Sequence, residues 1–327
     1  MEIDIRVINK IIIQVFLFTG LTSGQLSMPR ISQRAEVSQT IGLSKITVNY
    51  SRPGVKGREI WGKLVPYGLS KNSIGLKNEI PWRAGADENT TISFSHDVKI
   101  NRENLSAGRF GLQVIPEEND DWVIIFSKDN SAWGSFFYEQ KNDALRIKVK
   151  PEIADMQEWL EYSIENITEN SCDVFLKWEK KAIHFNVSFD IHKIVTDSLK
   201  QQLKGIAGFN WQSWNQAAAY CLQINEYLET GLEWCKTSIM LNENANNRNL
   251  LGYLLLAKGN DKDALIEFEE NTKKFPSNWN VFDSYAEVLQ KNGRKDESIK
   301  NYQKAFDLAP ENQKMRIKNI IDSINTN

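Results

Sequence analysis

Two stretches of the sequence repeat each other at a fixed spacing. Residues 251–276 read LGYLLLAKGNDKDALIEFEENTKKFP, and residues 285–310 read YAEVLQKNGRKDESIKNYQKAFDLAP. Bulky, small and turn-forming residues recur with an offset of 34 positions, so that Leu251, Gly252, Leu255, Gly259, Ala264, Phe268 and Pro276 return as Tyr285, Ala286, Leu289, Gly293, Ser298, Tyr302 and Pro310. A period of this length is typical of stacked helix pairs, with small residues where the helices touch. The repeat therefore predicts an α-helical solenoid.

The spacing and its pattern resemble tetratricopeptide repeats over residues 210–327. A third, looser unit lies upstream and lacks the glycine between its helices and the final proline; its matching residues are Ala218, Ala219, Leu222, Gly231, Cys235 and Ser238. Residues 315–324 carry isoleucines on roughly one side, which predicts a capping helix. About three units and a cap suffice to bury a continuous core.

A repeat solenoid presents a concave groove that suits an extended peptide. The candidate groove residues are Asn247, Tyr253 and Asn280, together with Asn249. A protein or peptide partner is therefore expected at the repeats. The alternative is that the groove holds the chain's own β-domain or its terminal helix.

The first half of the chain follows a different period. Apolar and polar residues alternate in Ile46–Tyr50, Thr91–Ser95, Trp122–Phe126, Leu145–Val149, Trp159–Ile164, Val174–Trp178 and Ile183–Val187. Such alternation places one face of a strand in a core and the other in water. Many short strands separated by polar turns predict an antiparallel β-sandwich or jelly-roll-like domain over residues 30–193. A linker helix over residues 194–209 is expected to join it to the solenoid, giving an all-β domain followed by an all-α domain.

Several motifs in the β-rich half occur in a recognisable order. They are Tyr50-Ser-Arg-Pro53, Lys56-Gly-Arg58, Pro66-Tyr-Gly68, Trp82-Arg-Ala-Gly-Ala86, Trp133-Gly134 and Asp143-Ala-Leu-Arg146. On these motifs, residues 36–190 resemble the family called domain of unknown function 2911. The resemblance implies a secreted β-rich domain that is sometimes joined to tetratricopeptide repeats. It implies no catalytic residues.

The first residues follow the order of a secretory signal. Arg6 and Lys10 precede a mostly apolar stretch over residues 11–22, and small residues follow up to Gly24. The stretch is shorter than the roughly 20 apolar residues of a membrane span. Residues 1–24 are therefore predicted to be a signal peptide cleaved near Gly24, with the mature protein exported to the periplasm or the extracellular space. The alternatives are a buried N-terminal strand or an uncleaved anchor, and no later segment resembles a membrane span.

Composition excludes some classes of protein. The 327 residues predict about two domains at roughly 150 residues each. Forty basic residues balance 42 acidic ones, which argues against nucleic-acid binding. The three cysteines include Cys221 and Cys235, which could meet, but buried reduced thiols are the favoured interpretation. Because no motif for a cofactor or a metal occurs, neither is predicted.

Residues 51–88 form a long stretch without strand character, rich in the residue types of recognition surfaces. The candidate ligand-binding residues are Arg52, Arg58, Trp61, Tyr67, Trp82, Arg83, Glu88 and Trp133. Arginine binds carboxylate and phosphate groups through two parallel hydrogen bonds, so the expected ligand is an anionic small molecule or glycan. In the alternative interpretation, the acids of this stretch pair with Arg52, Arg58 and Arg83 and only brace the loop. Trp122, Trp159 and Trp178 are predicted to lie in the core.

These observations favour an exported, non-catalytic binding protein, with a ligand in the β-domain and a protein partner on the repeats. One alternative is a glycan-active hydrolase that uses the 51–88 loop. Such an enzyme needs two carboxyl groups, about 5 Å apart for a retaining mechanism. Asp87 or Glu88 with Glu59 are the candidates. The other alternative is a structural scaffold in which the repeats are the sole interaction surface.

Overall fold

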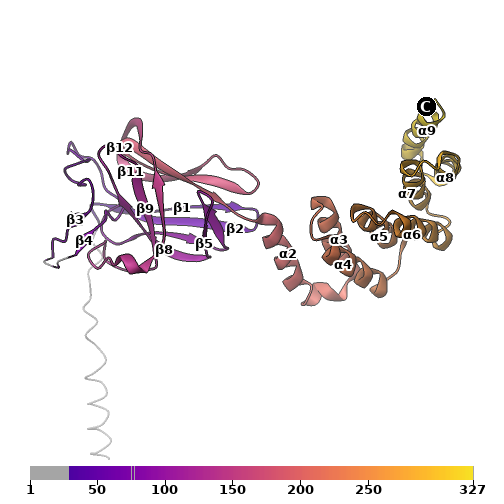
Figure 1. Cartoon of the computed structure of the whole chain (residues 1–327), viewed down its shortest axis with the longest axis horizontal. Coiled ribbons are helices and arrows are strands. Elements are labelled where there is room, and N and C mark those ends of the chain that lie inside the picture. Colours follow the sequence, from indigo (N-terminus) through magenta and orange to yellow (C-terminus); the bar gives the residue numbers. More distant parts are fainter. Residues whose placement is uncertain (1–28, 75, 77, 327) are drawn as a thin grey trace, which may run out of the picture.

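The computed structural model describes residues 29–74, 76 and 78–326. The predicted signal peptide lies outside these residues. A β-domain comes first in the chain and is followed by a series of helices, with α2 between the two (Figure 1). Within the described residues, no helix combines the length and the apolar character needed to cross a bilayer.

Two antiparallel sheets build the β-domain. The larger sheet has the order β1 (Gln33–Ile41), β2 (Ser44–Arg52), β5 (Thr90–Phe94), β8 (Gly108–Ile115), β9 (Trp122–Ser127) and β10 (Asp143–Val149). The smaller sheet has the order β11 (Glu152–Glu165), β12 (Ser171–Ser188), β6 (Val98–Ile100) and β7 (Glu103–Leu105). A short hairpin of β3 (Ser70–Lys71) and β4 (Glu79–Ile80) lies in the predicted loop, and a 3-10 turn, η1 (Gln140–Asn142), precedes β10.

The core lies between the two sheets, as the alternating pattern predicted. Ile46 and Val48 of β2 are fully buried, and so are Val174 and Val187 of β12 in the opposite sheet. The rings of Phe126 and Phe185 meet across the core with centroids 5.4 Å apart. Full burial of a side chain of this kind stabilises the fold by about 1.5–3 kcal/mol. The predicted antiparallel β-sandwich is confirmed.

The prediction that Trp159 lies in the core is wrong. Its side chain is 40% exposed, whereas the next residue, Leu160, is fully buried. Trp159 instead covers Gly54, where an added Cβ would lie only 3.2 Å from the indole ring. The alternation was therefore correct, but its phase was assigned the wrong way round. Trp122 and Trp178 are buried as predicted, with exposures of 1% and 2%.

The second half of the chain is helical. After α2 (Ile191–Gln202) and the 3-10 turn η2 (Ile206–Phe209), the helices are α3 (Trp211–Ile224), α4 (Leu228–Leu241), α5 (Ala245–Ala257), α6 (Asp261–Lys274), α7 (Trp279–Lys291), α8 (Lys295–Leu308) and α9 (Glu311–Thr326). Helices α3, α5 and α7 begin at intervals of 34 residues. The predicted α-helical solenoid is confirmed, and α2 begins three residues before the predicted linker.

The looser first unit keeps the same turn with a different residue. Asn225 lies 34 positions before Gly259, and both adopt a left-handed backbone, with φ of 53° and 82°. Asparagine tolerates this conformation better than most residues, because its short polar side chain can hydrogen-bond locally. Asn225 therefore takes the place of the missing glycine, and the turn between α3 and α4 still forms.

The last helix covers the open end of the repeats. Ile317 and Ile324 of α9 are buried in one cluster with Phe282 of α7 and Tyr302 of α8. This packing is that of the predicted capping helix. Cys172, Cys221 and Cys235 are buried free thiols, and burial raises the pKa of Cys235 to about 12.

Candidate functional site

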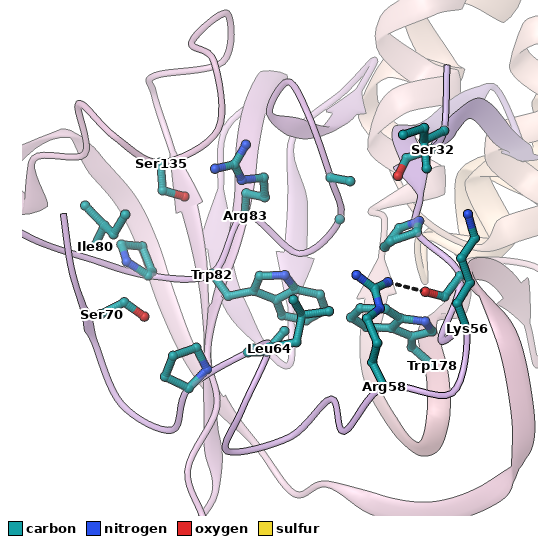
Figure 2. Close-up of a pocket in the computed structure, with 18 residues that line it drawn as sticks. Ser32, Lys56, Arg58, Leu64, Ser70, Ile80, Trp82, Arg83, Ser135 and Trp178 are labelled. Atoms are coloured by element: carbon teal, nitrogen blue, oxygen red, sulfur yellow. Dashed lines mark hydrogen bonds between the residues drawn. The ribbon is translucent and has the colours of Figure 1, made fainter. Parts of the chain in front are cut away.

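A pocket of about 360 Å³ opens in the β-domain beside the predicted loop. Figure 2 shows its side chains. It is lined by Ile31, Ser32, Pro53, Gly54, Lys56, Arg58, Leu64, Val65, Pro66, Ser70, Ile80, Pro81, Trp82, Arg83, Gly85, Ala86, Ser135 and Trp178. Most of these residues come from the 51–88 stretch, while Ser135 and Trp178 come from distant parts of the chain.

The centre of the pocket is aromatic. The rings of Trp82 and Trp178 are nearly parallel, with 14° between their planes and 5.9 Å between their centroids. Trp61 packs edge-on against Trp82 at 5.6 Å and reaches Trp122 behind it at 4.7 Å. The backbone of Trp82 is fixed because it exchanges two hydrogen bonds with Val114 of β8. The sandwich thus holds the indole pair rigidly at the pocket.

Arg83 contributes a positive charge that is held in place by backbone and ring contacts. Its Nη1 donates to the carbonyl oxygen of Asp87 at 2.6 Å, and its Cζ lies 5.0 Å from the centroid of the Phe136 ring. On its other side is Gly134, where an added Cβ would lie 2.3 Å from that Cζ. Burial lowers the pKa of the Arg83 guanidinium, and the nearby negative charge of Asp87 only partly opposes this shift.

Arg58 and Lys56 contribute two further positive charges. Arg58 donates from Nε to the carbonyl of Val55 at 3.1 Å and from Nη2 to that of Gly54 at 2.5 Å. The ammonium of Lys56 lies 5.6 Å from the ring centroid of Trp159. Among the ion pairs formed by the described residues, none involves Lys56, Arg58 or Arg83.

The lining therefore has an unbalanced charge. It contains three cationic side chains and, within the part of the chain that the structure describes, no aspartate or glutamate. Ser135 adds a hydroxyl that is 2% exposed and has no hydrogen-bond partner among the described residues. A guanidinium beside a hydroxyl and an aromatic surface can bind a carboxylate or phosphate whose body is apolar.

The loop that carries Gly134 and Ser135 is tied to β10 by one polar network. Tyr138 donates its hydroxyl hydrogen to Asp143 at 2.9 Å, and Arg146 donates to both Tyr138 and Asp143. Burial, together with the contact with Asp143, raises the pKa of Tyr138 to about 12. The Asp143–Arg146 motif of the sequence thus serves to fix one wall of the pocket.

The structure brings together three of the eight predicted ligand-binding residues: Arg58, Trp82 and Arg83 line the pocket. Trp61 packs behind the indole pair. The remaining four lie outside the lining. Arg52 donates to the carbonyl of Leu160, Tyr67 packs on Gly62, Glu88 pairs with Arg30, and Trp133 is 54% exposed.

The interpretation in which the acids of the loop brace its arginines is wrong for Arg58 and Arg83, which bind backbone carbonyls instead. The carboxylate Oε1 of Glu88 lies 2.7 Å from Nη1 of Arg30 and 3.9 Å from Nη1 of Arg34. Burial raises the pKa of Glu88, but the hydrogen bond from Arg30, a backbone hydrogen bond and the charges of Arg30 and Arg34 outweigh it and hold that pKa below its ordinary value. Arg52 lies 3.8 Å from the carboxylate of Glu161, which belongs to β11 and not to the loop, so the interpretation also fails for Arg52.

Sequence reasoning missed Lys56, Ser135 and Trp178. Lys56 belongs to the motif Lys56-Gly-Arg58, from which only Arg58 was selected as a candidate, so this motif could have indicated Lys56 as well. Trp178 alternates as a core residue should, and it is both buried and part of the pocket lining. No local pattern marked Ser135.

In the repeats, the assignment of Asn247 to the groove is wrong. Asn247 is fully buried, forms a capping box with Asn244 at the start of α5, and donates to Ser238 of α4. Tyr253 is half-buried and donates its hydroxyl hydrogen to Glu287 of the next unit at 2.8 Å. Asn280 is the second residue of α7 and is half-buried. Asn249 is buried and donates to Ser284 at 2.7 Å.

Together, the fold and the pocket define a class: a β-sandwich domain with a cationic, tryptophan-lined pocket, followed by helical repeats. Residues 32–187 match the family described as "Protein of unknown function (DUF2911)". No curated protein matches the chain.

Several solved structures are similar to part of the chain. MamA has 18% sequence identity and a TM-score of 0.33, covering 39% of this chain and 72% of MamA. PcrH from Pseudomonas aeruginosa has 15% identity and a TM-score of 0.32, covering 35% of this chain and 91% of PcrH. The Yersinia enterocolitica chaperone SycD, solved in complex with a peptide of the translocator YopD, has 15% identity and a TM-score of 0.32, covering 35% and 92%. Neither the family nor these structures assign an activity to this chain.

Proposed function

We propose that this protein is a binding protein whose β-domain takes up a small organic anion and whose helical repeats bind a protein partner. The observation that carries the first part is the charge of the pocket. Three cations line it beside two indole rings, and no described carboxylate does. Arg83 is half-buried and forms no ion pair among the described residues, and a partly buried charge without a counter-ion is costly, so an anion beside Arg83 would be stabilised there.

The geometry favours binding over glycan hydrolysis. A glycosidase needs two carboxyl groups beside its substrate. None of the three candidate acids lines the pocket, and the carboxylate of Glu88 is engaged by Arg30. The scaffold alternative is also less favoured, because it requires the arginine and tryptophan faces to be covered, whereas Arg58 is exposed and Trp82 and Arg83 are only half-buried in the lining of an open pocket.

The pattern of residues 1–24 supports export as part of the same proposal. The ligand and the partner would then be met in the periplasm or outside the cell. Localisation of the full chain and the mass of the mature N-terminus are the direct measurements.

The second part of the proposal rests on equivalent positions in the repeats. Gln212, Asn246 and Asn280 are each the second residue of the first helix in their unit, and they recur at 34-residue intervals. Gln212 and Asn246 are exposed and Asn280 is half-buried. A row of amide side chains can both donate to and accept from the backbone of an extended peptide. We therefore place the protein-binding surface along α3, α5 and α7.

Anion binding is tested by calorimetric titration of the purified full chain with benzoate, phenyl phosphate and glucuronate, and with the neutral benzyl alcohol and methyl glucoside. We expect at least one anion to bind and its neutral counterpart not to bind. Because a hydrogen bond to a charged group contributes about 1.5–3 kcal/mol, Arg83→Gln should weaken that anion roughly ten- to hundredfold.

Arg52→Gln is the matched control, because Arg52 belongs to the same stretch but binds Leu160 outside the pocket. Its effect on affinity should stay within about twofold. Failure of every anion to bind, or equal losses in the two variants, would contradict the proposal.

Peptide binding is tested by selecting displayed random peptides on the full chain and measuring their affinity by fluorescence anisotropy. We expect Asn246→Ala combined with Asn280→Ala to weaken the selected peptides at least tenfold, since both amides would face the peptide backbone. Lys262→Ala, at an exposed site on the second helix of the same unit, is the control. Selected peptides that bind equally well to both variants would place the partner elsewhere.

A further inference from the structure

One end of the pocket is a cationic corner built around Arg83. The guanidinium is confined between Gly134 and the Phe136 ring, and its hydrogen bond to the Asp87 carbonyl holds it there. Ser135, with its unpartnered buried hydroxyl, lies beside it (Figure 2). Moving the group across the pocket would require giving up these contacts.

A second cationic corner is built around Arg58. Its two hydrogen bonds go to carbonyls of its own turn, those of Gly54 and Val55. Gly54 is in turn bridged to Trp159 of β11, so the turn is anchored to the sandwich. Lys56 lies on the same side of the pocket and adds a second charge to this corner (Figure 2).

Apolar surface separates the two corners. In Figure 2 the indole of Trp82 lies between Arg83 on one side and Arg58 on the other, with the indole of Trp178 on the Arg58 side. Pro53, Pro81, Leu64 and Val65 complete the lining around the rings. A flat apolar body placed against the Trp82 ring would pack well, because an aromatic side chain offers a large apolar face.

In Figure 2 the two guanidinium groups lie apart, one held by the Asp87 carbonyl and the other by the Gly54 carbonyl, so a small single anion at one of them leaves the other without a counter-ion. We infer that the ligand of this pocket carries two anionic groups, one held by Arg83 and one by Arg58 with Lys56, joined by a flat apolar body that lies against Trp82. The anionic groups are carboxylates or phosphates, which share the chemistry that arginine recognises. This inference rests on the proposed anion binding and specifies its ligand class.

The test compares diacids with their monoacids by calorimetric titration of the purified full chain. The probes are terephthalate with benzoate, naphthalene-2,6-dicarboxylate with 2-naphthoate, and biphenyl-4,4′-dicarboxylate with biphenyl-4-carboxylate, which differ in the separation of their acid groups. We expect at least one diacid to bind ten times more tightly than its monoacid. Two equivalent acid groups alone would give only a twofold statistical gain, so a tenfold difference requires both corners.

Two variants then assign the corners. Arg58→Gln and Arg83→Gln should each weaken the preferred diacid about tenfold, while its monoacid should lose affinity in only one of them. Arg52→Gln is again the control and should change neither. Melting temperatures of all variants are measured alongside, and because Arg58 is exposed its replacement should leave the fold intact.

The outcomes separate the inference from the function on which it rests. If monoacids bind and no diacid exceeds its monoacid more than twofold, the two-corner inference is overturned and anion binding stands. If no acid binds at all, both fail. If Arg52→Gln weakens the diacid as much as Arg58→Gln does, the effect comes from overall charge, and the inference is again overturned.

Discussion

Replacing Phe268 with alanine is expected to lower the free energy of unfolding of the helical repeats by about 3–5 kcal/mol. Phe268 of α6 is fully buried and packs against Tyr253 with ring centroids 5.0 Å apart. It also fills the space over Gly252, where an added Cβ would lie 2.6 Å from the ring. Gly252 has no side chain that could fill the space left by the ring, so the substitution leaves a cavity. The measurement is urea unfolding of the full chain followed by circular dichroism at 222 nm.

Ile266 provides the control, since it lies on the same helix and is 58% exposed. Ile266→Ala should change the free energy of unfolding by no more than about 0.5 kcal/mol. Equal losses in the two variants would mean that the contact between helices at Gly252 and Phe268 is not what stabilises the stack.

The repeats were predictable because their 34-residue period determines both where the helices lie in the sequence and which residues join neighbouring helices. Residues 34 positions apart occupy equivalent places, so the pattern around Gly252 and Ala286 predicted both the helices and their contacts. The turn at Asn225 could not be identified from a search for glycine, because asparagine supplies the same left-handed backbone. The groove residues were harder to assign. Asn247 carries a side chain typical of a binding surface, yet it is buried at the start of its helix by a local cap.

The fold class of the β-domain could be predicted from the sequence, but which side chains of a strand face the core could not always be predicted. Alternation shows that neighbouring residues of a strand face opposite ways, and it does not by itself show which of them faces inward. Trp159 and Leu160 illustrate this, because both are large and apolar and either could have been the core residue. Packing of the Trp159 ring on Gly54 decided the orientation, and that contact joins residues about a hundred positions apart.

Contacts between distant parts of the chain also explain why only some residues of the candidate site were predicted. Arg58, Trp82 and Arg83 lie in one continuous stretch whose composition indicated recognition. Ser135 and Trp178 reach the pocket only through the fold, and Gly134 is needed because of the room that Arg83 takes. Glu88 was included because it is adjacent to the site in sequence, but Arg30 draws it away. Charge pairing between distant segments leaves no local pattern in the sequence.

Replacing Trp122 with alanine is expected to cost the β-domain about 3–5 kcal/mol of stability, the range for a fully buried tryptophan. Trp122 of β9 is 1% exposed and donates from its indole nitrogen to the carbonyl of Glu117 at 2.9 Å. Its ring also lies against Trp61, which in turn contacts Trp82 and Trp178. Its loss would therefore leave a cavity behind the pocket and weaken anion binding as well as the fold. Differential scanning calorimetry of the full chain measures the first effect, and titration with the preferred anion measures the second.

Trp133→Ala is the matched control, because it removes the same side chain from a site that is 54% exposed. Only the buried part of a side chain contributes hydrophobic stabilisation, so this variant should cost about 1 kcal/mol or less. The contrast separates the two classes of tryptophan in this chain: those that hold the sandwich and the pocket together, and those at its surface. Two results would show that the cluster of Trp61, Trp82, Trp122 and Trp178 does not support the pocket. One is a melting temperature of the Trp122→Ala protein equal to that of the Trp133→Ala protein, and the other is an affinity of the Trp122→Ala protein for the anion equal to that of the unaltered chain. In that case the two guanidinium corners alone would have to account for any anion binding.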